Sequence, residues 1–180
     1  MYLPPKFPLK KILERLIGER HGKGKEYYKN NKIKFEGEYY YGHKWNGIMH
    51  DYDNELSFEI KNGKGKEIEY DFYGKLKYEG EYINGERNGK GKEYVDKNKI
   101  IFDGEYLKGK RWKGKIKEYD HKDKLEFEGD VINGEKNGIG KEYDYDRLIF
   151  EGEYLNGKRH GKGKEYYDIG EIYWLLIQNK

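Results

Sequence analysis

The chain has 180 residues, of which 34% are hydrophobic and 39% are charged, and it contains no cysteine. The 37 basic and 34 acidic residues leave a net charge of +3, and few of the basic residues are arginine, so the balance does not favour nucleic-acid binding. The absence of cysteine excludes disulfides and thiolate zinc sites. No apolar run is long enough for a transmembrane helix, and no signal peptide is evident. We therefore expect a cytoplasmic protein, with a peripheral membrane location as the alternative.

Residues 8–17 are expected to form a short amphipathic helix, because their apolar residues recur at helical spacing and Gly18 follows as a breaker. We expect residues 1–17 to form a tail and a helix that caps whatever follows. The alternative is a helix that lies on a membrane surface. In that case its basic face would contact lipid through Lys10, Lys11 and Arg15.

The rest of the chain is built from repeats of one motif. Copies open at Phe35, Phe58, Tyr78, Phe102, Phe127 and Phe150, and a half copy occupies residues 18–34. The spacings are 23, 20, 24, 25 and 23 residues, which indicates a stacked array in which no unit buries its apolar face alone.

Each repeat is expected to form two antiparallel strands joined by a glycine-bounded turn. In the last copy, period-two alternation places Phe150, Gly152 and Tyr154 on one face of the first strand. The second strand covers residues 162–166. The recurring glycines, such as Gly161 and Gly163, are expected to leave room for aromatic rings from neighbouring strands.

The opposite face of the repeat is expected to carry a ladder of charges. Glu151 and Glu153 on the first strand would pair with Lys162 and Lys164 on the second. Such pairs on a solvated face contribute little energy each, and the interpretation that we favour for them is structural.

The combination of aromatic-Glu-Gly-Glu-aromatic, Asn-Gly and Gly-Lys-Gly at this period resembles the MORN repeat (membrane occupation and recognition nexus). The resemblance covers residues 18–172. It implies an all-β fold, an elongated single-layer antiparallel meander of about six to seven β-hairpin repeats, with the short N-terminal helix as a cap. It also implies a scaffold, a protein-interaction module or a homodimer, with binding of acidic phospholipid as a further implied role.

Three features depart from the common pattern. First, Tyr27, Tyr94, Tyr143 and Tyr166 are one place off the alternation, with glutamate on the glycine face, so either a bulge corrects the register or the buried side differs. Second, the copies at Phe35 and Phe102 have loops that count as one residue longer. Third, the copy at Phe58 has lost about six residues, which predicts a shorter hairpin.

The two longer loops each hold a tryptophan, Trp45 or Trp112, and replace the second glycine by Met49 or Ile116. Each tryptophan either fills the space that this change leaves or projects as a contact residue, and packing is the interpretation that we favour.

The last apolar stretch, within residues 173–180, is expected to be a capping edge strand. Tyr173, Trp174, Leu175 and Leu176 are candidate interaction residues, since a bare apolar edge favours pairing with a second copy. The alternative is a strand folded back over the last hairpin.

No motif for catalysis, cofactor binding or metal binding is present in the sequence. The five histidines are not spaced as chelators, Ser57 is the only serine, and the Gly-Lys-Gly-Lys stretches lack the spacing of a phosphate loop. We therefore expect a non-enzymatic scaffold or binding module without cofactors, which binds another protein or its own copy and no nucleic acid. Peripheral binding to anionic phospholipid, aided by Lys23, Lys25, Lys90, Lys92, Lys162 and Lys164, is the alternative.

Overall fold

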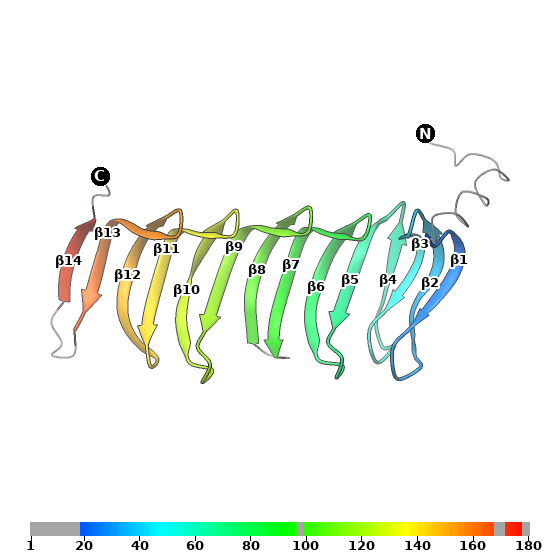
Figure 1. Cartoon of the computed structure of the whole chain (residues 1–180), viewed down its shortest axis with the longest axis horizontal. Helices are drawn as coiled ribbons and strands as arrows, with labels where there is room; N and C mark the ends of the chain where they lie inside the picture. Colours follow the sequence, from blue (N-terminus) through cyan, green and yellow to red (C-terminus); the bar gives the residue numbers. More distant parts are fainter. Residues whose placement is uncertain (1–18, 97–98, 168–171, 178–180) are drawn as a thin grey trace. The chain divides into compact units, whose positions relative to one another are not determined.

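The computed structural model describes residues 19–96 and 99–167, together with the backbone of 172–177, and every regular element in this part of the chain is a β-strand. Fourteen strands follow one another in sequence order in one sheet (Figure 1). The pairs β1–β2, β2–β3, β8–β9 and β12–β13 illustrate their antiparallel pairing. The strands are β1 Gly22–Tyr27, β2 Ile33–Tyr40, β3 His43–His50, β4 Ser57–Lys61, β5 Lys64–Tyr70, β6 Leu76–Ile83, β7 Glu86–Asp96, β8 Lys99–Leu107, β9 Lys110–Tyr119, β10 Leu125–Ile132, β11 Glu135–Asp144, β12 Arg147–Leu155, β13 Lys158–Tyr166 and β14 Ile172–Ile177.

The predicted all-β antiparallel meander, expected to have about six to seven hairpins, is confirmed, whereas the predicted helix over 8–17 lies outside the described residues. In the part of the chain that the structure covers, no helix is long and apolar enough to cross a membrane. The chain divides into two compact units. Among the described residues, the first comprises 19–67 and 82–86, and the second comprises 68–81 and the chain from 87 onward.

Tight turns with left-handed backbone join the two strands of a repeat. Asn156 and Gly157 have φ of 50° and 79°, and Asn62 and Gly63 have φ of 51° and 72°. Two successive residues with positive φ define the hairpin turn that Asn-Gly favours. The short hairpin predicted for the Phe58 copy is therefore confirmed, with Lys61 paired directly with Lys64 across this turn.

Except in the Phe58 copy, where Ile60 stands opposite Gly65, the core of a full copy is one aromatic ring lying over a pair of glycines. A Cβ atom built on Gly152 would lie 2.6 Å from Cζ of Phe150, and one built on Gly163 would lie 2.6 Å from Cε2 of the same ring. The two glycines face each other across β12 and β13. For Gly163 the ring comes from the neighbouring strand β12, as we expected, whereas for Gly152 it comes from two residues earlier on the same strand. The same glycine pairing recurs as Gly37–Gly47, Gly104–Gly114 and Gly129–Gly140.

Gly161 has a different role from the one predicted. Its φ is 63°, and the three atoms nearest to a Cβ built on it all belong to the side chain of Glu153. It therefore permits a left-handed residue in a bulge of β13, where the register with β12 shifts.

The alternation on the first strand is as predicted. The aromatic residues that open the copies at Phe35, Tyr78, Phe102, Phe127 and Phe150 are at most 1% exposed. The residue four positions later is also buried; it is Val131 in the Phe127 copy and a tyrosine in the other four. We call this side of the sheet the aromatic face, and the opposite side the polar face.

The tyrosines that are one place off the alternation of the second strand are accommodated in two ways, by bulges and by a change of face. Register shifts follow Glu93 and Glu142, and the tyrosine after each lies on the polar face. There the hydroxyls of Tyr94, Tyr143 and Tyr166 donate to a first-strand glutamate at 2.6, 2.8 and 2.7 Å. Glu93 and Glu142, in contrast, stay on the aromatic face, opposite Phe102 and Phe150.

The two tryptophan-containing copies keep the glycine pair, which corrects our expectation. Gly47 faces Gly37, so Met49 stands opposite Phe35 and replaces no paired glycine. Ile116 stands opposite Phe102 in the same way. Counted to the paired glycine, these loops are shorter than those of the regular copies. No ring is displaced, and Met49 and Ile116 join the core at 1% and 6% exposure.

Candidate functional site

A glutamate, an aromatic ring and a cation recur together on the aromatic face at the junctions between repeats. The glutamate lies near the end of the second strand of one repeat and stands opposite the aromatic residue that opens the next. The pairs are Glu26–Phe35, Glu93–Phe102, Glu118–Phe127 and Glu142–Phe150. A glutamate in such a position lies beside an apolar ring and needs a charged partner, because an unpaired buried charge is costly.

The partner is a lysine or arginine from the second strand of the following repeat. The guanidinium carbon of Arg159 lies 4.0 Å from the centre of the Phe150 ring, and its Nη2 donates to Glu142. Lys136 Nζ lies 3.8 Å from the Phe127 ring centre and 2.8 Å from Glu118. Each cation therefore covers a ring and reaches back to the previous repeat, which combines cation–π and ionic attraction.

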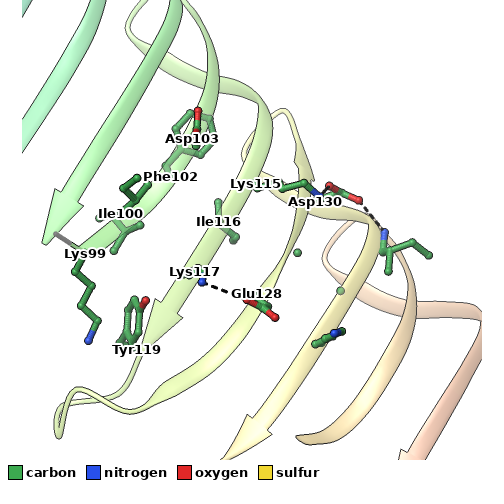
Figure 2. A pocket seen from close by; sticks show the side chains of 15 residues that line it. Lys99, Ile100, Phe102, Asp103, Lys115, Ile116, Lys117, Tyr119, Glu128 and Asp130 are labelled. Atoms are coloured by element: carbon green, nitrogen blue, oxygen red, sulfur yellow. Dashed lines mark hydrogen bonds and ion pairs between the residues drawn. The ribbon is translucent and has the colours of Figure 1, made fainter. Parts of the chain in front are cut away.

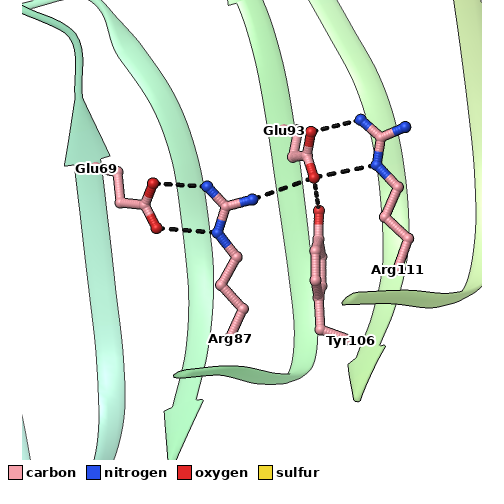
Figure 3. Close-up of polar contacts among 5 residues, drawn as sticks. All are labelled: Glu69, Arg87, Glu93, Tyr106 and Arg111. Carbon is pink, nitrogen blue, oxygen red and sulfur yellow. Dashed lines mark hydrogen bonds and ion pairs between the residues drawn. The ribbon is translucent and has the colours of Figure 1, made fainter. Parts of the chain in front are cut away.

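The network is most extensive around Glu93 in the second unit (Figure 3). Arg87 donates to both carboxylate oxygens of Glu69, at 2.9 and 2.6 Å, and to Glu93 at 3.2 Å. Arg111 donates to Glu93 from Nε at 3.1 Å and also from Nη2, and the hydroxyl of Tyr106 donates to the same carboxylate. One chain of contacts thus links two glutamates and two arginines across neighbouring repeats.

These contacts decide the charge state of the network. Burial raises the pKa of Glu93, but hydrogen bonds from Arg111 and Tyr106 and the charge of Arg87 lower it by more than burial raises it. The pKa of Glu93 therefore lies below its usual value. Burial and then the Glu93 carboxylate raise the pKa of Tyr106. A carboxylate held ionised and a phenol held neutral suit a structural ion network. General acid catalysis requires the opposite shift of a carboxyl pKa.

The polar face carries the predicted ladder of charges in altered form. Lys164 lies 3.3 Å from Glu151, as expected, and Lys92 lies 3.5 Å from Asp103. Glu153, however, stands opposite His160 and lies over Gly161, and is not opposite Lys162. The bulge at Gly161 causes this difference because it shifts the pairing between the two strands.

A pocket of about 610 Å³ opens among β8, β9, β10 and β11 of the second unit (Figure 2). Its polar rim includes the ion pairs of Lys115 with Asp130 at 2.8 Å and of Lys117 with Glu128 at 3.4 Å. Ile139 contributes an apolar side chain to it. Opposite charges line the pocket and neutralise each other locally, so it has no single-sign character that would select a small ion.

The two candidate tryptophans differ in how far they are buried. Trp45 is partly buried; its ring centre lies 5.0 Å from that of Tyr40, and a Cβ atom on Gly63 would lie 3.0 Å from its Cζ3. Trp112 is more open, at 38% exposure, with Lys113 Nζ 4.6 Å from its ring centre. Trp45 therefore packs against the turn of the short hairpin, and Trp112 faces solvent in part.

The side chains of the remaining candidate residues lie outside the part of the chain that the structure describes. The candidate interaction residues Tyr173, Trp174, Leu175 and Leu176 belong to β14, which pairs with β13, but their side chains lie outside the described part. The candidate lipid contacts Lys10, Lys11 and Arg15 are also outside it. Within the residues that the structure describes, no group of three or more histidine, cysteine, aspartate or glutamate side chains could hold a metal ion.

Sequence reasoning missed the cations of the repeat junctions, although the pattern contains a signal for them. A basic residue stands two positions after the turn glycine in six copies: Arg20, Lys44, Arg87, Arg111, Lys136 and Arg159. Their partners lie in other repeats, so the pairing becomes visible only once the repeats are stacked.

The MORN repeat family model matches residues 18–33, 78–99, 127–147 and 150–172. Comparison with curated proteins gave no match. The copies that open at Phe35, Phe58 and Phe102 lie outside the matched residues, and they are the copies with the tryptophan loops and the shortened hairpin. MORN repeats are generally non-catalytic binding repeats. The matched segments, the ring over each glycine pair and the hairpin meander identify this chain as a MORN repeat protein.

Proposed function

We propose that this chain is a non-enzymatic scaffold that binds another protein, through a surface that its repeats hold rigid. The observation that carries the proposal is the single layer. Every described regular element is a strand of the sheet, so among these residues no helix covers either face. A sheet face with exposed apolar side chains normally packs against a further element, and here that element can come from a partner.

The ion networks support a rigid surface. The ion network of Glu69, Arg87, Glu93 and Arg111 connects successive repeats. The copies other than the one at Phe58 also contribute a buried ring over a glycine pair. A binding surface that is already ordered loses less entropy when a partner docks. The proposal therefore assigns the charged residues of the aromatic face to holding the surface in shape.

Binding to anionic lipid is the less favoured alternative, for a reason of local charge. Several strand lysines that could meet a membrane are paired with acidic neighbours, as Lys25 is with Glu36 at 2.9 Å and Lys92 with Asp103 at 3.5 Å. Attraction of a lysine to an anionic surface falls when a carboxylate lies beside it.

The test uses the full-length chain as bait in extracts of the cells that produce it. Captured proteins would be identified by mass spectrometry, purified, and titrated against the chain by calorimetry. We expect at least one purified protein to bind with defined stoichiometry, and a chain lacking residues 173–180 shows whether the final strand contributes. Self-association is measured separately by light scattering. If no purified candidate binds and the chain instead sediments with anionic vesicles, the scaffold proposal fails.

A further inference from the structure

On the basis of the proposed function, we infer that the polar face of β8–β12 docks an acidic amphipathic α-helix of a partner protein. The surface, called here the apolar patch, consists of five side chains of the second unit. They are Leu107 at 50% exposure, Trp112 at 38%, Ile132 at 46%, Ile139 at 57% and Leu155 at 42%. Scattered exposed apolar residues need no explanation, so the case depends on how these five are arranged.

The patch follows from the alternation of the strands. Leu107, Ile132 and Leu155 each come directly after a buried residue of the aromatic face and are each the last residue before a turn. They therefore project to the polar face, near the same edge of the sheet. Ile139 precedes the buried Gly140 on β11, between the strands that hold Ile132 and Leu155.

Ile139 is the apolar residue of the patch on the strand between those of Ile132 and Leu155, and it stands opposite Glu153. At the corresponding place, between two glycines, other repeats have lysine: Lys23, Lys90 and Lys162. Asp130, which lies beside this residue, pairs instead with Lys115 at 2.8 Å and accepts from the backbone nitrogen of Ile139 at 3.3 Å. This repeat thus has an apolar side chain where those repeats have a charged lysine. The same side chain lines the 610 Å³ pocket.

A helix suits this surface better than an added strand. Strands β8 to β12 are paired on both sides, so they have no free backbone edge for strand addition. A helix satisfies its own backbone hydrogen bonds and needs only side-chain contacts. Strands lie about 4.8 Å apart, so Ile132 on β10 and Leu155 on β12 are separated by roughly 10 Å across the sheet. Seven residues of an α-helix rise by about 10.5 Å, which matches this spacing.

The charges around the patch indicate the sign of the partner. Lys108, Lys110 and Lys158 are exposed and have no ionic partner among the residues that the structure describes. Lys113 pairs with Glu105 at 3.2 Å, and the further acids are Glu135, opposite Ile132, and Glu153, opposite Ile139. The three lysines outnumber these two acids, which favours a helix with glutamate or aspartate beside its apolar stripe.

The test measures binding of a designed peptide to the full chain by fluorescence anisotropy. The probe is a fluorescein-labelled peptide of about 18 residues with leucine at i, i+3 and i+7 spacing and glutamate on the flanks. The control peptide has the same composition in an order without an apolar stripe. We expect saturable binding of the probe alone, and a loss of affinity of about tenfold or more in Ile139→Lys, a substitution that sister repeats already accommodate.

Ile48→Lys in β3 is the matched control. Ile48 is also an exposed isoleucine, at 40%, and the sister repeats again have lysine at its place, but it lies in the first unit. We expect this variant to bind the probe like the parent chain. Circular dichroism of both variants confirms that they fold.

The inference is overturned if both peptides bind equally, if neither binds, or if Ile139→Lys binds the probe as tightly as the parent. It is also overturned if the Ile139→Lys chain loses sedimentation with phosphatidylserine vesicles but not binding of the probe, since the patch would then be a membrane contact. If Ile139→Lys still binds a purified natural partner while the probe never binds, this inference fails and the proposed function stands.

Discussion

Gly152→Ala should destabilise the chain through steric conflict with the Phe150 ring and with the backbone of β13, although alanine normally suits a strand better than glycine. The new Cβ atom would lie 2.6 Å from Cζ of Phe150 and 2.7 Å from Cα of Gly163. Carbon atoms in favourable contact lie about 3.5–4.0 Å apart, so the ring or the strands must move by roughly 1 Å. Phe150 is fully buried, so the ring has no open space to enter.

The magnitude follows from two opposing effects. Overpacking of a filled core typically costs about 1–3 kcal/mol. The lower entropy of the unfolded chain with alanine returns about 0.4–1 kcal/mol. We expect a net loss of about 1–2 kcal/mol in the free energy of unfolding, measured by urea titration followed by circular dichroism.

A double-mutant cycle with Phe150→Leu isolates the conflict. Leucine lacks the end of the ring that meets the new Cβ, so Gly152→Ala should cost at least about 1 kcal/mol less in the Phe150→Leu background. Gly109→Ala is the control, because its Cβ would have no atom within 4 Å and its cost arises only from a φ of 77°. A coupling within about 0.3 kcal/mol of zero for Gly152 and Phe150 would refute the ring-over-glycine explanation.

Three further predictions concern the junctions and loops. The pKa of Glu93 is depressed in the folded state, so the ionised carboxylate stabilises the fold fully above the unfolded pKa of about 4.3, and this stabilisation is lost as the pH falls toward the folded pKa. Between pH 6 and pH 3, the free energy of unfolding from urea titrations should therefore fall more for the parent chain than for Glu93→Gln. Equal falls would contradict this. Arg159→Met should lower the free energy of unfolding by about 1–3 kcal/mol, and it should cost less when Glu142 is already glutamine. If its cost is the same in both backgrounds, the two side chains do not form a stabilising ion pair. Trp45→Ala should destabilise the chain by at least about 1 kcal/mol more than Trp112→Ala, because Trp45 packs on Gly63 and Tyr40, and the reverse order in urea titrations would argue against that packing.

The sequence predicts the features of this fold that depend on local order. Alternation places Phe150, Gly152 and Tyr154 on one face, and the Asn-Gly pair at Asn62 marks the short hairpin, because both signals lie within a few residues. Register is harder to predict. One extra residue in a bulge moves every following side chain to the other face, and pattern alone does not say where the bulge falls. For this reason the pairing of Glu153 and the role of Gly161 differ from expectation.

The ion networks need knowledge of the stacking. Arg159 and Glu142 are 17 residues apart, and no helical or strand period links such positions. They meet because the Glu142 strand lies two places before the Arg159 strand in the sheet. A regular basic residue after each turn glycine marks one partner in the sequence, but only the sheet order identifies the other.

The shortened copy shows that these networks follow a rule. A cation normally reaches back two strands to the glutamate opposite the aromatic residue that opens its own repeat. The Phe58 copy has lost the segment that would carry its cation, because Lys61 turns directly into Lys64. The residue opposite Phe58 is accordingly Met49, not glutamate, and it is buried in a cluster with Phe35, Tyr39 and Ile60.

At the β9–β10 junction, a shifted register places a glutamate opposite the aromatic ring. Ile116 occupies the usual place of the glutamate, but the register between β9 and β10 is displaced, so that Glu118 stands opposite Phe127 and Lys136 binds it at 2.8 Å. Where the cation is present, a glutamate is brought to the ring, and where the cation is absent, methionine replaces the glutamate. An ionised carboxylate beside a buried ring without its cation would be costly, which explains why the two residues occur together or are lost together.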